Sequence, residues 1–219
     1  MNKRLYVAIF LLLTLTTYSV QHKFNFNHEI KIKKIIIANN KIVHEKRIIR
    51  DLSFLYEKNP AFIRTNKIQE ILTKIDFIES FEIKKIYPDK IKIKIFEKKP
   101  IVIIQNKKEK KYYTSSGDLV DFLDLNEFKN LPIVFGDKKN FEIFYEILKN
   151  LKFPINEIKA LYLFESKRWD LITFDDQIVK LPINNFESSL KNFIELREKL
   201  SFSKYKTFDY RINGQLILK

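Results

Sequence analysis

Isoleucine and lysine alternate along several short stretches of the chain, and this period of two predicts β-strands with one buried and one wet face. In the clearest stretch, Ile91 and Ile93 alternate with Lys92 and Lys94. Two other stretches carry apolar residues at helical spacing, and Asn66 opens the second in a pattern that resembles a capping box. The order predicts a β-α-α-β-β unit, with strands at 30–37, 78–87 and 90–97 and helices at 43–58 and from 66 onward.

Beyond Pro100 the pattern changes to many short strands with two helical stretches between them. Strands are predicted at 101–105, 110–114, 119–122, 158–164, 169–174, 177–181 and 207–218, and helices around 141–148 and 185–200. Each apolar face needs another element to cover it. The sequence therefore predicts an α+β protein, in which the β-α-α-β-β unit precedes a mixed β domain with helices on one side.

The first apolar run, from Leu5 to Val20, contains no charged residue and follows Lys3 and Arg4. As a helix it would extend about 24 Å, which is short against a hydrocarbon core of about 30 Å. Two interpretations stay open, a cleaved signal peptide and a retained anchor. In both, the basic residues remain cytoplasmic and the chain beyond about residue 21 is exported. The anchor interpretation gives a cytoplasmic tail at 1–4, a transmembrane segment at 5–20 with Leu5, Phe10, Leu13 and Val20 in the bilayer, and a linker at 21–29.

Charge and composition narrow the classes of function. The formal net charge is +14, but the excess is mostly lysine, is spread from Lys31 to Lys219, and alternates with isoleucine on the predicted strands. We therefore expect the positive charge to be spread over the surface and not gathered in a single patch, and we expect no nucleic-acid partner. The three glycines are too far apart to form a phosphate-binding loop. The absence of cysteine excludes disulfides and cysteine-ligated metals.

Residues that could support catalysis or metal binding are sparse. The histidines are His22, His28 and His44, and neither a His-Glu-x-x-His spacing nor a cysteine accompanies them. Asp175 and Asp176 are more typical of a hairpin turn than of an acid/base pair. We predict a non-enzymatic protein with no cofactor, no metal site and no small-molecule substrate. Its free sheet edges would bind other proteins by strand addition.

A set of motifs in a fixed order carries a resemblance to a known family. Residues 78–93 have the pattern of a strand, a Pro88-Asp89 turn and a second strand, and the motif Glu97-Lys98-Lys99-Pro100 follows them. The later motifs are, in order, Gly117-Asp118, Leu131-Pro132 with Gly136, Trp169-Asp170-Leu171 and Asp209-Tyr210-Arg211. With the leader and the β-α-α-β-β pattern, the chain resembles the bacterial FtsQ/DivIB family of cell-division proteins. Lys98 replaces the usual arginine, and Asp176-Gln177 and Leu181-Pro182 replace turns in which the family often has glycine.

The resemblance implies that residues 30–98 form a POTRA domain, that residues 100–219 form the family's β domain, and that the leader is an uncleaved anchor. It implies a scaffold of the division septum, held in the inner membrane by one helix with its C-terminal domain in the periplasm. The partners implied are the small bitopic proteins FtsB and FtsL. The alternative, which a cleaved leader favours, is an exported POTRA chaperone or assembly factor for outer-membrane or secreted proteins.

The predicted partner surface is the last strand, 207–218, because no later strand lies beside it to cover its free side. The resemblance implies that this region receives an FtsB segment. An amphipathic ring and a guanidinium fork there are side chains that commonly anchor interfaces. The predicted contact residues are Phe208, Tyr210, Arg211, Ile212 and Leu216. Phe208, Tyr210 and Ile212 could equally be ordinary sheet residues.

Overall fold

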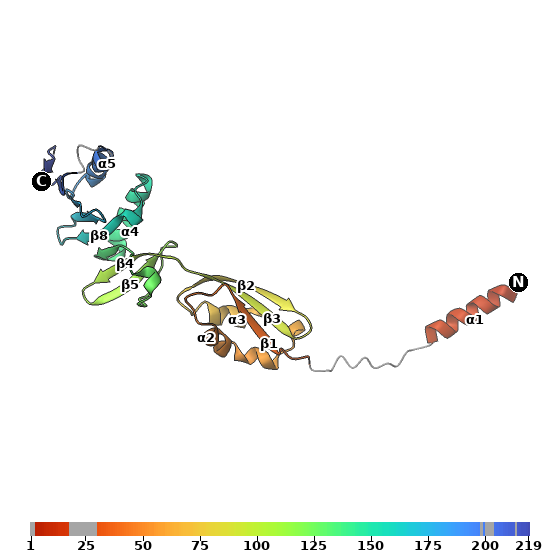
Figure 1. Cartoon of the computed structure of the whole chain (residues 1–219). Helices are drawn as coiled ribbons and strands as arrows, with labels where there is room; N and C mark the ends of the chain where they lie inside the picture. The colour runs from red at the N-terminus through yellow and green to blue at the C-terminus, as the bar shows by residue number, and fades with distance from the viewer. Residues whose placement is uncertain (1–2, 18–29, 198, 200–203, 213) are drawn as a thin grey trace.

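The computed structural model describes residues 3–17, 30–197, 199, 204–212 and 214–219, and shows an α+β protein (Figure 1). One helix comes first along the chain, and two folded units follow it. The first unit contains a small sheet and the second contains a much wider one. We refer to them as the POTRA-like unit (residues 30–98) and the C-terminal unit (residues 100–219).

The first helix corrects the prediction of a transmembrane segment. α1 (Lys3–Thr17) has 15 residues, a length of about 22 Å compared with the roughly 30 Å of a hydrocarbon core. Among the residues that the structure describes, no helix combines the length and the apolar character needed to cross a membrane. Leu5, Phe10 and Leu13 lie on α1 with exposed side chains, whereas Val20 and the expected linker 21–29 fall outside the described residues. Lys3 and Arg4 belong to the helix and not to a separate tail.

The POTRA-like unit has the predicted β-α-α-β-β order, and its strands lie in the order β1-β3-β2. β1 (Lys34–Ala38) pairs in parallel with β3 (Lys90–Glu97), and β2 (Ile78–Ile86) pairs antiparallel with the other side of β3. α2 (Glu45–Asp51) and α3 (Thr65–Leu72) cover one face of this sheet (Figure 1). They contribute Ile48, Ile68 and Leu72 to the core that buries this face. The predicted register is confirmed, because Ile93 is fully buried and Lys92 is exposed.

Two helix boundaries in this unit differ from the prediction. The expected helix over 43–58 stops at Asp51, because Leu52 leaves the helical conformation (φ −102°, ψ 12°), and the chain continues as 3₁₀ turns at Ser53–Glu57 and Pro60–Phe62. The N-cap of α3 is Arg64, two residues before the predicted Asn66, and it forms no side-chain cap. Tertiary burial of Leu52 and Leu55 decides the path here more than local propensity does.

The lysines of this sheet also differ from the expectation of dispersed charge. The register places Lys34 beside Lys90 and Lys84 beside Lys92, all on the face opposite the helices. Alternation along each strand therefore gathers the lysines on one face of the sheet.

Nine strands of the described residues form the sheet of the C-terminal unit, in the order β12-β11-β10-β9-β8-β7-β4-β5-β6. They are β4 (Pro100–Asn106), β5 (Glu109–Thr114), β6 (Leu119–Asp121), β7 (Ile133–Phe135), β8 (Ile158–Leu163), β9 (Trp169–Thr173), β10 (Ile178–Lys180), β11 (Thr207–Asp209) and β12 (Ile217–Leu218). α4 (Lys138–Asn150) and α5 (Phe186–Arg197) bury Phe144 and Phe193 in one core with Leu171 and Val179. The helices therefore cover one face of the sheet, as predicted, and we call the opposite face helix-free.

The end of the chain is a hairpin and not the single strand predicted over 207–218. β11 pairs in parallel with β10, and β12 turns back to pair antiparallel with the outer side of β11. Gly214 adopts a positive φ of 72°, a conformation open to glycine, and the Gln215 amide donates to the Ile212 carbonyl at 3.1 Å. Leu216 therefore precedes the short strand β12 and does not continue β11.

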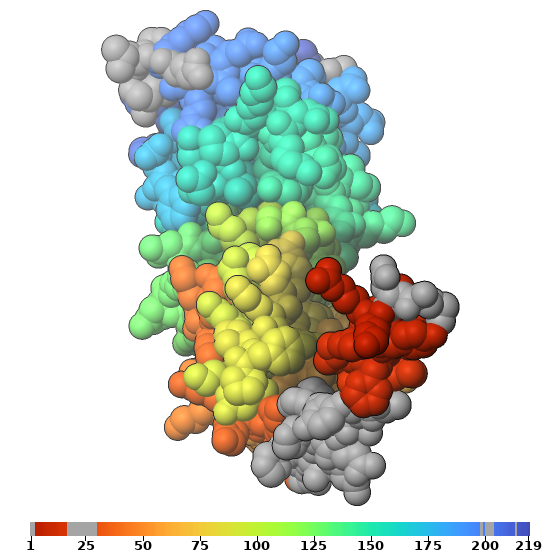
Figure 2. Space-filling view, turned by 90° about the vertical axis from the view of Figure 1, so that its right-hand side faces the viewer, coloured from red at the N-terminus to blue at the C-terminus, as the bar shows by residue number. Residues whose placement is uncertain are grey.

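The two units share a hydrophobic core at the β6 end of the wide sheet. Tyr112, Val120 and Phe128 belong to the same buried cluster as the POTRA-like core, and the rings of Phe77 and Tyr112 meet edge to face at 6.2 Å. In the space-filling view the yellow residues of the first unit lie directly against the green start of the second (Figure 2). The junction is a packed interface, and not a flexible linker.

Polar contacts fix the same junction. The carboxylate of Glu97 at the end of β3 accepts hydrogen bonds of 2.8–3.1 Å from the backbone amides of Lys41, Ile42 and Val43. The next residue, Lys98, pairs with Asp118 at 2.8 Å and thereby lowers the pKa of that carboxyl. Glu97 thus fixes the 41–43 loop to the end of β3 within the first unit, and Lys98 connects that unit to the second.

Candidate functional site

Among the described residues, one edge of the wide sheet is strand β12, which is only two residues long. Thr207 and Lys219 exchange both of their backbone hydrogen bonds, at 3.0 and 3.1 Å. In an antiparallel pair such couples alternate with couples whose amides and carbonyls point away from each other. The N–H and C=O of Leu218 therefore point outward, where a further strand could pair with them.

Two of the predicted contact residues are buried behind this edge. Phe208 is fully buried and meets the ring of Phe193 on α5 edge to face at 5.0 Å. Tyr210 is 7% exposed, and its hydroxyl lies 2.9 Å from Oδ1 of Asn192, also on α5. Burial raises the pKa of the Tyr210 phenol well above its ordinary value. Both rings hold β11 against α5 and do not present a surface to a partner.

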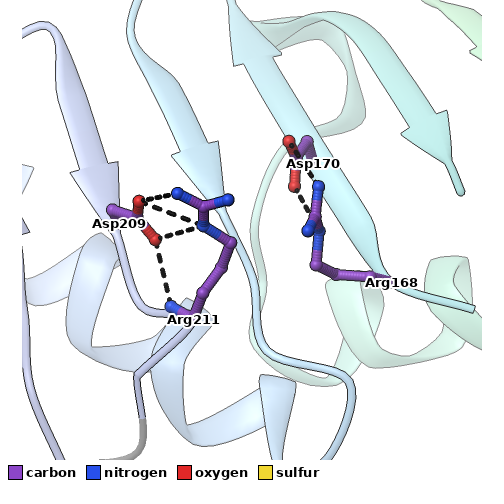
Figure 3. Close-up of polar contacts among 4 residues, drawn as sticks. All are labelled: Arg168, Asp170, Asp209 and Arg211. Carbon is purple, nitrogen blue, oxygen red and sulfur yellow. Dashed lines mark hydrogen bonds and ion pairs between the residues drawn. The ribbon is translucent and has the colours of Figure 1, made fainter. Parts of the chain in front are cut away.

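Arg211 lies two residues beyond β11 and pairs with Asp209, the last residue of that strand. Its Nε lies 2.9 Å from Oδ1 of Asp209 and its Nη2 lies 2.6 Å from Oδ2, a two-point contact (Figure 3). This guanidinium lowers the pKa of the Asp209 carboxyl. The pair stiffens the start of the final turn, because the Arg211 backbone amide also donates to Asp209 at 3.1 Å.

A second pair lies two strands away on the same helix-free face. Asp170 on β9 accepts from Nε of Arg168 at 3.2 Å (Figure 3). Lys180 on β10 stands in register with both Asp170 and Asp209. Burial raises the pKa of the Asp170 carboxyl despite the opposing effect of Arg168. Alternating charges thus cross three adjacent strands, so this face is locally close to neutral.

Two hollows flank the segment 182–185 beside the final hairpin. The larger, of about 400 Å³, is lined by polar side chains of α5 and by the tip of the hairpin. Ile212, which is 52% exposed, and the half-buried Leu216 line it, so these two predicted residues are accessible. The other, of about 390 Å³, has Arg168 and Arg211 on its walls.

The structure also adds residues that the sequence did not indicate. Asn192, Ser188 and Ser189 line the larger hollow from α5. They stand beside the apolar positions Leu190 and Phe193, which are buried in the core, so helical spacing marks them as off the core face but gives no sign of a common site.

No arrangement suited to metal or acid/base chemistry stands out in the described part of the chain. No group of three or more His, Asp or Glu residues there could hold a metal ion. His44 precedes α2, whereas His22 and His28 lie outside the described residues. Asp176 forms a turn with positive φ and pairs with Lys159 at 2.8 Å, as its sequence context indicates.

Two family models match the chain in succession. The POTRA domain of FtsQ type matches residues 30–98, and the C-terminal domain of the cell-division protein FtsQ/DivIB matches residues 102–211. The second match ends at Arg211, before strand β12.

Relatives that match most of the chain agree with these two matches. The protein named "Cell division protein FtsQ" of Rickettsia prowazekii (strain Madrid E) is 27% identical over 89% of this chain and 72% of its own length. The proteins of the same name from Bartonella bacilliformis and Rickettsia felis are 24% and 28% identical, each over 91% of this chain and over 69% and 74% of their own lengths.

Proposed function

Because the chain belongs to the FtsQ/DivIB family of cell-division proteins, we propose that it is a non-enzymatic scaffold that gathers other division proteins at the septum. The proposed partners are small proteins of the FtsB and FtsL type. The alternative role, a POTRA chaperone for exported proteins, is less well supported, because the segment after the POTRA match is of the FtsQ/DivIB type.

The observation that carries the proposal is the outward backbone of β12. Leu218 directs one amide and one carbonyl away from β11, at the edge of a sheet whose helix-covered face is already packed. An extended partner segment can continue the ladder there through main-chain hydrogen bonds.

Side chains near this edge would add selectivity. Ile212 offers exposed apolar surface beside the polar hollow, and Leu216 lies next to the strand. The other three predicted residues support this edge without facing the partner. The rings of Phe208 and Tyr210 anchor β11, and Asp209 holds the guanidinium of Arg211. Of the five predicted residues, we therefore assign direct contact to Ile212 and Leu216, and support to the other three.

The test compares Leu218→Pro with Leu218→Ala. Both variants shorten the side chain, but only proline removes the outward N–H. If a partner strand pairs with β12, Leu218→Pro weakens binding to the FtsB/FtsL-type pair of the same organism roughly tenfold or more. Leu218→Ala retains most of the affinity. Binding is measured by titration calorimetry with full-length variants, whose thermal melts check that the fold is intact.

Two outcomes contradict the proposal. Equal loss in both variants means that the side chain and not the backbone makes the contact, and unchanged binding in both means that partners dock elsewhere. Truncation after Tyr205 is a poorer probe, because it also removes Phe208, which is fully buried in the core.

A further inference from the structure

The helix-free face of the POTRA-like sheet carries a dense set of lysines. Lys90 stands between Lys34 on β1 and Ile86 on β2, and in the next row Lys92 stands between Ile36 and Lys84. Lys94 extends the central column by one more row. We call the five residues Lys34, Lys84, Lys90, Lys92 and Lys94 the lysine face.

Acidic neighbours neutralise little of this charge. Glu82 faces Lys94 across the β2–β3 pair, with Nζ and Oε2 3.7 Å apart and both side chains well exposed. Within the residues that the structure describes, the other four lysines make no ion pair. Asp89, at the end of the sheet, pairs with Lys33 at 3.8 Å. The lysine face therefore keeps a strong positive charge.

Apolar side chains accompany the lysines and extend to one end of the sheet. Ile36 and Ile86 lie half-buried between them. Just beyond β2, Tyr87 is 65% exposed. Phe96, which is half-buried, follows Lys94 on the same face of β3, and the Lys94 amine lies 4.6 Å from the centroid of its ring. Apolar and aromatic side chains thus lie among and beside the lysines.

These features distinguish between classes of anionic partner. Bidentate recognition of nucleic-acid phosphates and bases favours the forked donors of arginine, and the lysine face contains none. Flexible lysine stems over apolar side chains, with the rings of Phe96 and Tyr87 nearby, suit a surface of anionic headgroups above an apolar layer. We propose that the lysine face docks the POTRA-like unit onto a bilayer surface containing anionic phospholipids.

The test uses the full-length protein and vesicle flotation. The variant Lys84→Gln/Lys90→Gln/Lys92→Gln is compared with Lys107→Gln/Lys108→Gln/Lys139→Gln, which removes the same charge from exposed positions on the C-terminal unit. Vesicles contain phosphatidylcholine alone or mixed with phosphatidylglycerol. Because α1 is identical in all proteins, the difference between the two vesicle types isolates the electrostatic contribution.

We expect wild type and the control variant to prefer the anionic vesicles, with a preference that high salt removes. The Lys84/Lys90/Lys92 variant should lose roughly tenfold or more of that preference, with an unchanged thermal melt. Equal losses in both variants, or no loss in the first, overturn the proposal. So does stronger retention of wild type on polyglutamate or on an oligonucleotide than on the anionic vesicles, because it assigns the lysine face to another partner.

Discussion

The two ends of the wide sheet end in different ways. At the β6 end, aromatic side chains on the helix-free face are buried against the POTRA-like unit, with Phe77, Tyr112 and Phe128 in one cluster. At the β12 end, the same face carries paired charges, and in the two-residue last strand Leu218 directs its backbone N–H and C=O to the outer side. One end is closed by side-chain burial, and the other is open to hydrogen bonding.

This difference suggests that one end of the sheet contributes to the stability of the fold and the other to partner recognition. Burial of large rings removes apolar area from water and dominates the free energy of folding. Unpaired backbone groups at an exposed edge contribute little to folding but offer a template for another strand. Changes at the closed end should therefore alter unfolding, and changes at the open end should alter binding.

The largest expected effect is at Tyr112. Tyr112→Ala removes a ring that is 1% exposed and contacts Phe77, Phe122 and Phe128. We expect the free energy of unfolding to fall by about 3–5 kcal/mol. At the open end, Leu218→Ala should lower it by only about 1 kcal/mol, since Leu218 is half exposed. Urea unfolding of both variants measures the contrast, and equal losses would show that the two ends are packed alike.

A smaller effect is expected at Glu97. Glu97→Gln keeps the shape but removes the charge that three backbone amides share. Charge-assisted hydrogen bonds of this kind suggest a loss of about 1–3 kcal/mol in the same urea experiment. Glu82→Gln, on the exposed face of β2, is the matched control and should change stability by less than about 0.5 kcal/mol. If the two variants unfolded alike, the hydrogen bonds of Glu97 would add no stability next to the closed end.

The smallest effect is a pH dependence that compares one carboxylate at each end. Arg211 lowers the pKa of Asp209 and Lys98 lowers the pKa of Asp118, both below 3.8. A lowered pKa stabilises the fold above the unfolded value of 3.8 and is lost as the pH falls through the folded value. Asp209→Asn should therefore flatten the acid side of the stability profile. Asp118→Asn should flatten it less, because solvent screens its half-exposed carboxylate. Acid unfolding curves with the wild-type slope in Asp209→Asn would contradict this ordering.

Sequence periodicity predicted the parts of the fold that depend on neighbours along the chain. Ile91, Ile93 and Ile95 are fully buried as their alternation indicated, and the helical spacing of Phe141, Phe144 and Leu148 matches the buried stripe of α4. Local patterns report which side of an element is apolar, and that side is the one that becomes buried.

Features set by distant contacts could not be predicted in this way. β7 (Ile133–Phe135) has three residues and too little pattern to mark it as a central strand. Nothing near Tyr112 in the sequence indicates that Phe77 covers it. The final hairpin depends on the positive φ of Gly214, and the burial of Tyr210 depends on a hydroxyl contact with α5. The lysine face required the register between strands, which no single strand contains.

Chain order and spatial order diverge at one place among the described strands of the wide sheet. β4, β5 and β6 follow one another outward on one wing, and β7 to β12 follow one another on the other, so that β4 beside β7 is the single non-consecutive pair. Each wing can form from strands that follow one another along the chain, while the β4–β7 pairing must bring together strands that β5 and β6 separate. We therefore expect β4 and β7 to join late during folding. The seam between the wings, and neither outer edge, would then set the folding rate of the C-terminal unit.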